Sequence, residues 1–343
     1  MMKSLPADVS RRALMLMSMG AAALATLPKL SFAAMPTKVT TANGWVSNVQ
    51  YSGFFLAIEQ GYFEEFGVTA EFLPGGPNAP DTLVSLSAGQ AEIATANWLP
   101  FIDAVQKGND FVLLGAQWAK SPAAVMSMAK RPLLEPKDIL GMKILIQKPS
   151  DSQIIDAILD GAGLPHDYTT APTGFSPEPL LAGDGDAYLA FATNQPITLE
   201  KMGLVAGKDF HVTLLDDLGY HVTQGLYLTS RKFLTENRAA VVGYVAGMIK
   251  GWKAAIAEPQ AALDVVLNKY GADLGLDAAQ QKRQNELQMP LVAPARDTKL
   301  FALQPDVFTG PMSEVAKAAG RTVPEFGRIA DTSVVDEALA KLA

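Results

Sequence analysis

Short apolar segments alternate with helix-like segments along the first part of this 343-residue chain, and this alternation most strongly limits its fold. Gly, Pro and polar residues separate the segments, as expected for strands and helices that are joined by short loops. The expected strands are Lys38–Thr41, Val68–Leu73, Ala91–Ala94 and Phe111–Ala116, and the expected helices are Tyr51–Gln60, Asp81–Ala88 and Leu99–Lys107. This β-α-β-α-β-α-β order predicts a mostly parallel sheet that is covered by helices on both faces.

A second alternating region follows a stretch that is interrupted by prolines. Its expected strands are Val125–Ala129, Lys143–Gln147, Asp186–Phe191, Phe210–Leu215 and His221–Thr229, and its expected helices are Asp151–Gly161 and one that ends at Gly183. Two α/β units joined by two chain crossings predict a hinged, two-lobed protein that binds its ligand between the lobes. We expect lobe one to contain residues 34–118 and 223–343, and lobe two to contain residues 119–222.

The chain is mostly helix-like from Arg231 onward, and Pro259 is expected to begin a new helix. Apolar side chains recur in this region with a period of 3.6 residues, which indicates one buried face of a helix. We expect these side chains to belong to the core and not to a ligand-binding face. They are Val241, Val245, Met248, Trp252 and Ile256.

The composition excludes several classes of function. The chain has no cysteine, which excludes disulfides, thiolate zinc sites, cysteine-ligated iron–sulfur clusters and cysteine nucleophiles. Imidazole groups are limited to His166, His211 and His221. The net charge is -7, so the composition does not indicate a basic surface for nucleic acid. We therefore expect no metal, no cofactor and no nucleic-acid partner.

The N-terminus has the features of an export signal. The pair Arg11-Arg12 precedes an uncharged run, Ala13–Pro28, which is short for a membrane span but suits a signal-peptide core. Small residues at Ser31 and Ala33 then predict cleavage near Ala33. The arginine pair resembles a twin-arginine signal, and an ordinary Sec signal is the alternative. We expect a periplasmic protein from which the signal peptide, residues 1–33, has been removed.

Several motifs together resemble the nitrate/sulfonate/taurine and thiamine-pyrimidine-precursor binding proteins of ABC importers. That family typically has a Trp, an Asn three residues on and a Gly eight residues on, and the matching residues are Trp45, Asn48 and Gly53. The other matching motifs are Gly61–Val68, Gly89–Ile93, Lys137–Ile144, Leu181–Ala187 and Thr193–Pro196, of which the last two are similar to the pyrimidine-precursor branch. The resemblance implies a periplasmic binding protein of type II, with two α/β lobes and a helical C-terminal region. It also implies a monomer that delivers a small molecule to an ABC permease at the inner membrane.

Aromatic and amide side chains near the expected strand ends form the candidate ligand site. Trp45 and Tyr51 would sandwich a flat ring, and Asn48 lies between them with hydrogen-bond donors and acceptors. The remaining candidates are Asn97, Trp98, Gln117, Trp118, Gln147, Tyr188, Asn194 and Gln195. The structural alternatives are core packing for the Trp side chains, helix capping for the Asn side chains, and a hinge role for the pair at residues 117 and 118.

The charge pattern ranks the ligand classes. Residues 39–106 contain no Lys or Arg, although they contain seven acidic residues. A strong anion is usually bound by cations, whereas helix N-termini can also bind anions. We therefore expect a neutral heteroaromatic ligand that resembles a thiamine pyrimidine precursor. The alternatives are a flavin or a small anion such as sulfonate, taurine or nitrate, and the anion would use Lys120, Lys130, Arg131 or Lys148.

An enzyme is the alternative from another class. A eukaryotic relative in this superfamily makes the thiamine pyrimidine from its own active-site histidine and uses an iron-associated cysteine motif. Tyr51 occupies the position that matches this histidine, and the chain has no cysteine. Asp184 and Asp186 are a close carboxylate pair near the expected cleft, but Asp186 resembles a structural position of the family. We therefore expect a binding protein with no catalytic residues.

Overall fold

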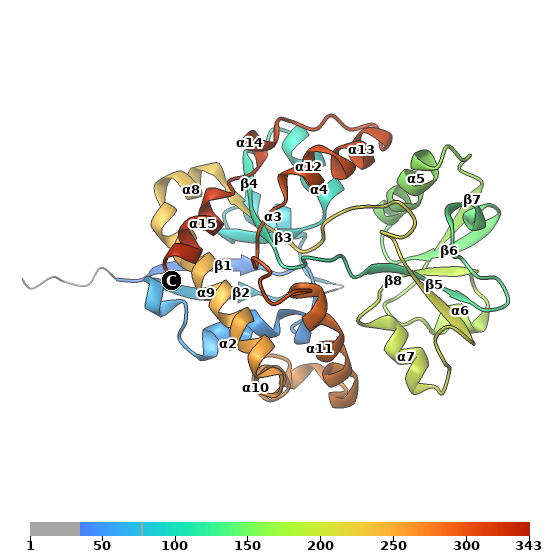
Figure 1. The fold of residues 1–343 in the computed structure, drawn as a ribbon, viewed down its shortest axis with the longest axis horizontal. Helices are drawn as coiled ribbons and strands as arrows, with labels where there is room; N and C mark the ends of the chain where they lie inside the picture. Colours follow the sequence, from blue (N-terminus) through green and yellow to red (C-terminus); the bar gives the residue numbers. More distant parts are fainter. Residues whose placement is uncertain (1–34, 77) are drawn as a thin grey trace, which may run out of the picture. The chain divides into compact units, whose positions relative to one another are not determined.

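The computed structural model describes residues 35–76 and 78–343, which form two lobes that each contain one five-stranded sheet (Figure 1). The arginine pair, the apolar run and the expected cleavage site lie outside the described residues. The two-lobed α/β fold that we expected from the sequence is confirmed. Within the described ranges, no helix is long and apolar enough to cross a membrane.

The first sheet has the strand order β2-β1-β3-β10-β4. Its strands are β1 (Thr37–Ala42), β2 (Val68–Leu73), β3 (Ile93–Ala96), β4 (Phe111–Ala116) and β10 (Leu226–Ser230). Strand β1 pairs in parallel with β2 and β3, as expected from the β-α-β pattern. Strand β10 returns from the second lobe and pairs antiparallel with both β3 and β4. The sheet is therefore mixed but mostly parallel, as expected: β2, β1, β3 and β4 run in one direction, and β10 runs against them.

The second sheet has the order β7-β6-β8-β5-β9 and is mixed for the same reason. Its strands are β5 (Ala123–Met128), β6 (Met142–Ile146), β7 (Tyr168–Pro172), β8 (Ala187–Phe191) and β9 (Phe210–Leu214). Strand β6 pairs in parallel with β7 and β8, whereas β5, the strand that enters this lobe, pairs antiparallel with β8 and β9. The entering strand of each lobe therefore runs against its neighbours.

Helices cover the sheets and extend the first lobe at its C-terminal end (Figure 1). In the first lobe they are α2 (Ser52–Glu59), α3 (Thr82–Ser87), α4 (Trp98–Gln106), α8 (Arg231–Glu236), α9 (Arg238–Ala257), α10 (Pro259–Val265), α11 (Ala278–Val292), α12 (Pro305–Thr309), α13 (Pro311–Ala318), α14 (Phe326–Ile329) and α15 (Ser333–Ala340). In the second lobe they are α5 (Ser152–Gly161), α6 (Glu178–Ala182) and α7 (Gln195–Lys201).

Helix α9 packs closely on α2, which leads directly into the candidate site. A Cβ atom built at Gly53 of α2 would lie 2.4 Å from Cδ2 of Trp252, so no larger residue fits there without a shift of the indole. The predicted core stripe is confirmed: Val241, Val245, Met248 and Trp252 are buried, and Ile256 is partly buried in the same cluster. The glycine of the family motif is therefore explained by helix packing.

Two chain segments cross between the sheets, residues 117–122 and residues 215–225. They lie side by side, since the backbone N–H of Gln117 donates to the carbonyl of Gly225 at 2.9 Å. The Trp118 ring lies against Gly225, where a Cβ atom would be 2.7 Å from Cδ1 of the indole. Gly225 has a φ of 66°, a left-handed conformation that glycine adopts at low cost. The structure thus places Gln117 and Trp118 at the crossing, as expected.

Two elements of the second lobe were not expected from the sequence. Strand β7 lies at an edge, and most of its side chains are exposed or half-buried, so it lacks an apolar pattern. Helix α7 begins at Gln195, and its seven residues are too few to show a helical period. The strand expected from His221 begins at Leu226, because residues 221–225 form the second crossing.

Candidate functional site

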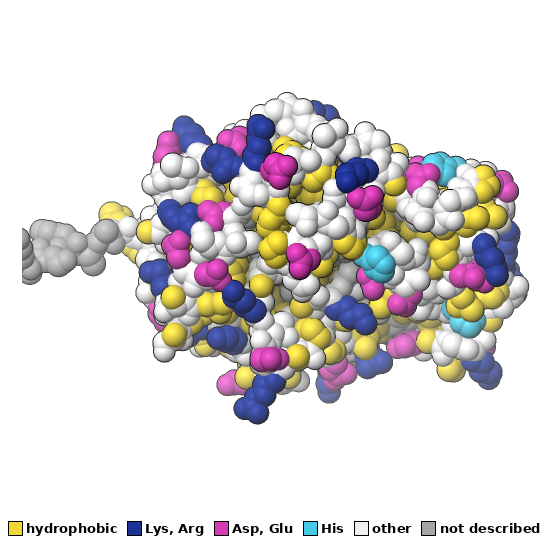
Figure 2. Space-filling model, turned by 45° about the horizontal axis from the view of Figure 1, so that its top comes forward, with side chains coloured by type: hydrophobic (Ala, Val, Ile, Leu, Met, Phe, Trp, Pro, Cys, Tyr) yellow, Lys and Arg dark blue, Asp and Glu magenta, His cyan; other side chains and the backbone are white. Residues whose placement is uncertain are grey.

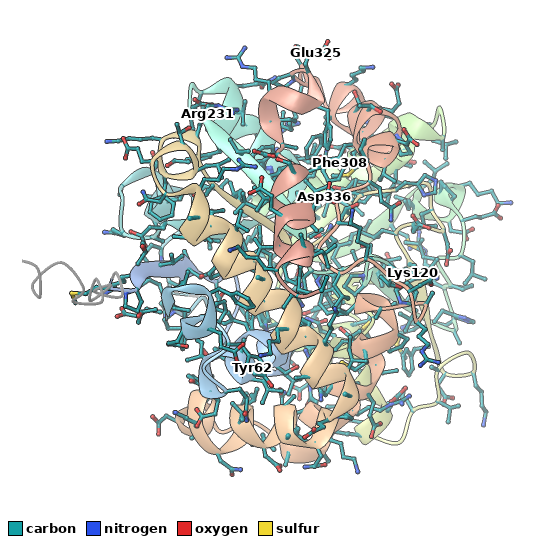
Figure 3. The ribbon with its side chains drawn as sticks, turned by 60° about the vertical axis from the view of Figure 1, so that its left-hand side comes forward. Tyr62, Lys120, Arg231, Phe308, Glu325 and Asp336 are labelled. Atoms are coloured by element: carbon teal, nitrogen blue, oxygen red, sulfur yellow. The ribbon has the colours of Figure 1, made fainter. Side chains whose placement is uncertain are left out.

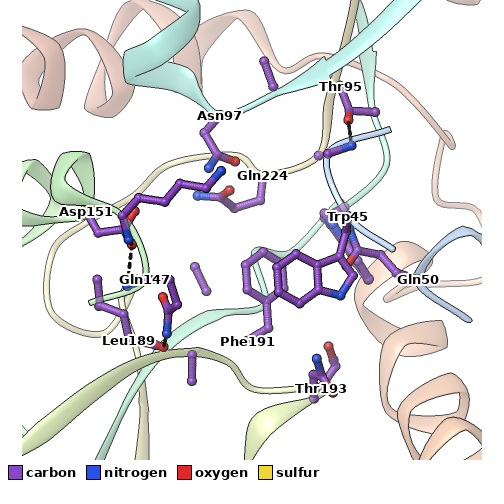
Figure 4. A pocket seen from close by; sticks show the side chains of 18 of the residues that line it. Trp45, Gln50, Thr95, Asn97, Gln147, Asp151, Leu189, Phe191, Thr193 and Gln224 are labelled. Carbon is purple, nitrogen blue, oxygen red and sulfur yellow. Dashed lines mark hydrogen bonds between the residues drawn. The ribbon is translucent and has the colours of Figure 1, made fainter. Parts of the chain in front are cut away.

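A cavity of about 240 Å³ lies between the two sheets and takes side chains from both lobes (Figure 4). Several helices begin at its wall. Asp81 precedes α3, Asn97 precedes α4, Asp151 precedes α5 and Asn194 precedes α7. This arrangement follows from the parallel strands, whose carboxyl ends lead into helix N-termini at the same edge of a sheet.

Eight of the eleven ligand-binding residues that the sequence predicted line the cavity. From the first lobe and the crossings these are Trp45, Tyr51, Asn97, Gln117 and Trp118, and from the second lobe they are Gln147, Asn194 and Gln195. Asn48, Trp98 and Tyr188 are not among the lining residues.

Aromatic rings contribute to the cavity wall from both lobes. Trp45 follows β1 and is half-buried, and Phe175 lies in the loop between β7 and α6. Their rings meet edge to face, with centroids 4.3 Å apart and planes at 84°. Phe191, at the end of β8, also lines the cavity and is labelled with Trp45 in Figure 4. The site thus has apolar rings on both sides, which suits a flat apolar or heteroaromatic group.

Tyr51 lines the cavity, but its side chain is almost fully buried among protein groups. Its side chain is 2% exposed. Burial raises the pKa of the phenol well above its usual range, although hydrogen bonding to the Thr95 side chain and to the backbone of Trp45 and Gly44 lowers it in part. The neutral phenol therefore supports the segment that carries Trp45. Trp45 and Tyr51 both line the cavity, and the sandwich of a flat ring between them stays a prediction.

Amide side chains supply most of the polar groups of the cavity, and four of them are held by hydrogen bonds to the protein. Gln117 Nε2 donates to the carbonyl of Gln50 at 2.8 Å, and Gln147 Nε2 donates to the carbonyl of Leu189 at 2.8 Å. Gln195 Oε1 accepts from the backbone N–H of Phe191 at 2.8 Å, and Asn194 Oδ1 accepts from Gln280 Nε2 at 3.2 Å. Gln117 Oε1 also accepts from the hydroxyl of Tyr227 at 3.5 Å. The other three amides are fixed at one end, and their second polar atom is left to bond a ligand.

Two carboxylates and one ammonium group line the cavity. Asp81 Oδ1 accepts from the backbone N–H groups of Leu83 at 2.9 Å and Val84 at 3.3 Å, which caps α3. Asp151 Oδ2 accepts from the backbone of Lys148 at 2.9 Å and of Gln147 at 3.2 Å. Burial raises the pKa of the Asp151 carboxyl, while these two backbone hydrogen bonds lower it in part. These helix ends already have an acidic partner, so they attract a second anion less strongly.

Among the described residues, Lys148 is the one cation that lines the cavity. Lys120 is exposed at the surface (Figure 3), and Arg131 pairs with Asp186 at 2.8 Å; neither is among the lining residues. Asp186 Oδ2 also accepts from the backbone N–H of Lys143 at 2.8 Å, so this carboxylate connects β6 and the start of β8. Acidic and basic side chains are interspersed over the face shown in Figure 2.

Three candidates have structural roles instead. Asn48 is buried and accepts from the backbone N–H of Gln50 at 3.0 Å, so it caps the short helix Val49–Tyr51. Trp98 is fully buried, and its Nε1 donates to the carbonyl of Met312 at 2.7 Å, so it belongs to the core against α13. Tyr188 is fully buried, and its hydroxyl donates to the carbonyl of Gly174 at 3.1 Å. These three expectations of a cavity-facing side chain were wrong.

Other lining side chains were not expected from the sequence. Phe175 and Phe191 lie at a loop and a strand end of the second lobe, Gln224 lies in the second crossing, and Gln284 lies in α11. The strand end at Phe191 was a usable signal, since Asn194 and Gln195 were found in the same way. Phe175 and Gln284 come to the cavity through long-range packing, for which the local sequence has no signal.

Among residues 35–76 and 78–343, no group of three acidic or imidazole side chains is arranged to hold a metal ion. The close pair Asp184 and Asp186 does not line the cavity. The polar part of the cavity wall consists mainly of amides and backbone groups, which can donate and accept hydrogen bonds.

The described residues have the two-lobed fold of the periplasmic binding proteins. A family model described as "NMT1/THI5 like" matches residues 48–262, which is more than half of the chain, so the protein belongs to this family. A riboflavin-binding protein, RibY, from Chloroflexus aurantiacus is 23% identical over 243 residues, which cover 68% of this chain and 67% of the relative. A formylaminopyrimidine-binding protein from Halalkalibacterium halodurans is 22% identical over 265 residues, which cover 76% and 74%.

Solved structures share this fold at low identity. The periplasmic aliphatic sulphonate binding protein SsuA from Escherichia coli has a TM-score of 0.62 and 18% identity, over 83% of this chain and 86% of SsuA. A desulfurization enzyme, DSZB, has a TM-score of 0.58 and 13% identity, over 90% of this chain and 100% of that enzyme. Transport proteins and an enzyme therefore use the same fold, and the fold alone does not choose between them.

Proposed function

We propose that this protein is the substrate-binding component of an ABC importer and that its ligand is a small, neutral nitrogen heterocycle. Two curated relatives, a riboflavin-binding protein and a formylaminopyrimidine-binding protein, are both named after a nitrogen heterocycle, which supports a heterocyclic ligand for this protein. The observation that carries the proposal is the chemistry of the cavity wall. It combines apolar rings from both lobes with amide side chains, and it contains two carboxylates but a single lysine among the described residues.

The size of the cavity favours one ring over a flavin. Its volume of about 240 Å³ is below the roughly 300–1,000 Å³ that is typical of sites for drug-sized ligands. Its charges favour a neutral ring over a sulfonate, because a desolvated anion would face Asp81 and Asp151 with Lys148 as its cation. A thiamine-pyrimidine-like compound therefore ranks above the flavin and anion alternatives.

A thermal-shift screen of the purified protein tests the ligand class. The panel contains formylaminopyrimidine, riboflavin, taurine and an alkanesulfonate. A compound at 100 times its dissociation constant adds about 2.7 kcal/mol to the free energy of unfolding, so a true ligand raises the melting temperature clearly. We expect the largest shift with formylaminopyrimidine. A shift with the sulfonates alone would contradict the ligand class, and no shift with any compound would contradict the proposed function.

We also propose that lobe one, residues 34–118 and 223–343, closes on lobe two, residues 119–222, when the ligand binds. The support for this is the pair of crossings that meet at Gln117 and Gly225. A ligand that binds the closed state better shifts the population toward it. Solution scattering should then show a smaller radius of gyration with saturating formylaminopyrimidine, and an unchanged curve would contradict closure.

The remaining parts of the proposal concern export and transport. We propose a periplasmic monomer that is exported through a twin-arginine signal, is cleaved near Ala33 and delivers its ligand to an inner-membrane permease. Replacement of Arg11 and Arg12 by Lys should block export, and undiminished export would leave the Sec route. The absence of cysteine and the buried, hydrogen-bonded state of Tyr51 weigh against the pyrimidine-synthase alternative.

A further inference from the structure

One face of α11 carries a row of four buried amide side chains. They are Gln281, Gln284, Asn285 and Gln288, and each is at most 5% exposed. Their spacing of three, four and seven residues places them on one side of the helix. This side lies against the short helix Val49–Tyr51, which leads into α2.

Three of these amides attach α11 to the segment that carries the aromatic part of the site. Gln281 Oε1 accepts from the backbone N–H of Val49 at 3.1 Å, and Gln288 Nε2 donates to the carbonyl of Val49. Asn285 Nδ2 donates to the carbonyl of Pro259 at 2.9 Å, and its Oδ1 accepts from the hydroxyl of Ser52 at 3.1 Å. These contacts give α11 a fixed position next to the cavity.

Gln284 differs from these three amides. It lines the cavity, it is 2% exposed, and its Oε1 is buried with no hydrogen-bond partner in the part of the chain that the structure describes. Gln288 Oε1 also lacks a partner there, but Gln288 does not line the cavity. A buried polar atom without a partner is costly and rare in folded proteins. At the wall of a binding cavity, such a group is explained when the ligand supplies the missing hydrogen bond.

We propose that Gln284 is a specificity-determining residue of the ligand site and that it recognises the edge of an amino-substituted nitrogen heterocycle. A primary amide has a donor and an acceptor side by side. An amino group next to a ring nitrogen presents the complementary pair, and Gln binds such an edge with two hydrogen bonds in adenine recognition. Rotation of the amide by 180° exchanges its donor and acceptor, so either order on the ring can be matched.

The position of α11 supports this assignment. Gln280, one turn before Gln284, donates to Asn194 of the second lobe at 3.2 Å, and Lys201 of α7 pairs with Asp277 at 2.6 Å. The same helix therefore contacts the second lobe beside the cavity. A ring held between the lobes would present its edge to Gln284 while its faces contact the aromatic side chains.

The inference rests on the proposed function, and it is tested by comparing two probes. The first is formylaminopyrimidine, whose ring carries an amino group beside a ring nitrogen. The second is the same compound with hydrogen in place of that amino group. Calorimetry should show that the wild-type protein prefers the first probe by about tenfold or more, as expected for a site whose amide is left unpaired by the second probe.

Q284M removes the amide at nearly constant volume and should bind the first probe at least about tenfold more weakly, with most of the preference lost. Q260M is the matched control, because it makes the same change at an exposed glutamine of α10 that contacts Asp264 and does not line the cavity; its preference should persist. If Q284M does not fold, Q284N keeps an amide but shortens its reach, and it should also lose the preference.

If the variant that folds keeps both the wild-type affinity and the wild-type preference, the role assigned to Gln284 is wrong, while the proposed ligand class is unaffected. Failure of the wild-type protein to bind either probe would overturn the proposed ligand class and this assignment together.

Discussion

The indole of Trp45 and the phenyl ring of Phe175 meet edge to face, although one ring follows a strand of the first sheet and the other follows a strand of the second. This contact connects the two lobes at the wall of the cavity. Its two rings therefore form an aromatic part of the cavity wall to which both lobes contribute.

Truncation of the two rings should weaken ligand binding by different amounts. Trp45→Ala should cost about 1–3 kcal/mol of binding free energy, because it removes both ring stacking and buried apolar area. Phe175→Ala should cost about 0.5–1.5 kcal/mol, since it removes mainly one aromatic contact. Calorimetric titration with formylaminopyrimidine measures both values.

Trp98→Phe is the control for a tryptophan outside the cavity. It removes the hydrogen bond from Nε1 to the carbonyl of Met312 and should lower the free energy of unfolding by about 1–3 kcal/mol. Ligand affinity should remain close to that of the wild-type protein. Wild-type affinity in Trp45→Ala would contradict the assigned role of the indole.

The salt dependence of binding should be weak. Lys148 is exposed, and the other polar side chains of the cavity wall are mainly carboxylates and amides. We therefore expect that the ligand is not held by an ion pair with a lysine or arginine side chain. Lys148→Met should change the affinity for formylaminopyrimidine less than about twofold, as should an increase in ionic strength from about 0.05 to about 0.5 M. Lys143→Met, an exposed lysine on β6 outside the cavity, is the matched control. A steep loss of affinity with salt and with Lys148→Met, but not with Lys143→Met, would favour an anionic ligand.

The local sequence predicted most strands and helices because their apolar periodicity is a local property. It did not predict that β10 would enter the first sheet between β3 and β4, since strand pairing across the crossing depends on contacts far apart in sequence. The parallel order expected from β-α-β units therefore held for β1–β3 and for β6–β8, but not for the strands that follow a crossing.

The site residues, too, could be predicted only where the local sequence decides their position, and not where contacts far apart in the chain decide it. Trp45 and Trp98 both follow a first-lobe strand, and the sequence gives no reason to separate them. The structure separates them because the Trp98 indole finds a carbonyl partner at Met312, far along the chain, and packs against Phe308. Gln284 was missed for a related reason: the packing of α11 against Val49 and Ser52 brings it to the cavity.

Gly225 should be essential for the geometry of the crossing. Gly225→Ala forces a side chain into a left-handed backbone and places its Cβ 2.7 Å from the Trp118 ring, so it should destabilise the protein by about 1–3 kcal/mol. Gly219→Ala is the matched control, because Gly219 has a φ of 86° but no atom within 4 Å of a Cβ. Chemical denaturation should show a larger loss for Gly225→Ala. Equal losses would mean that the Trp118 contact adds nothing to backbone strain.

The C-terminal helix α15 should lose its anchorage when the solution becomes acidic. Arg238 Nη1 contacts Asp331 Oδ2 at 2.8 Å, and Arg238 Nη2 contacts Glu337 Oε1 at 2.7 Å. Burial alone would raise the pKa of the Asp331 carboxyl, but hydrogen bonds from Arg238 and Ser333 outweigh it and hold that pKa below its usual range.

A carboxyl whose pKa is lower in the folded than in the unfolded state stabilises the fold above its unfolded pKa of about 3.9. This stabilisation is lost as the pH falls through the lower, folded pKa. Arg238→Met should therefore lower the free energy of unfolding by about 0.5–1 kcal/mol at pH 7, and the difference from the wild-type protein should shrink below about pH 4. Lys38→Met, which removes the exposed pair with Glu71, controls for the loss of a surface charge. Denaturation curves at several pH values measure the difference, and a difference that persisted unchanged at about pH 2 would show that Arg238 acts through packing and not through the Asp331 charge.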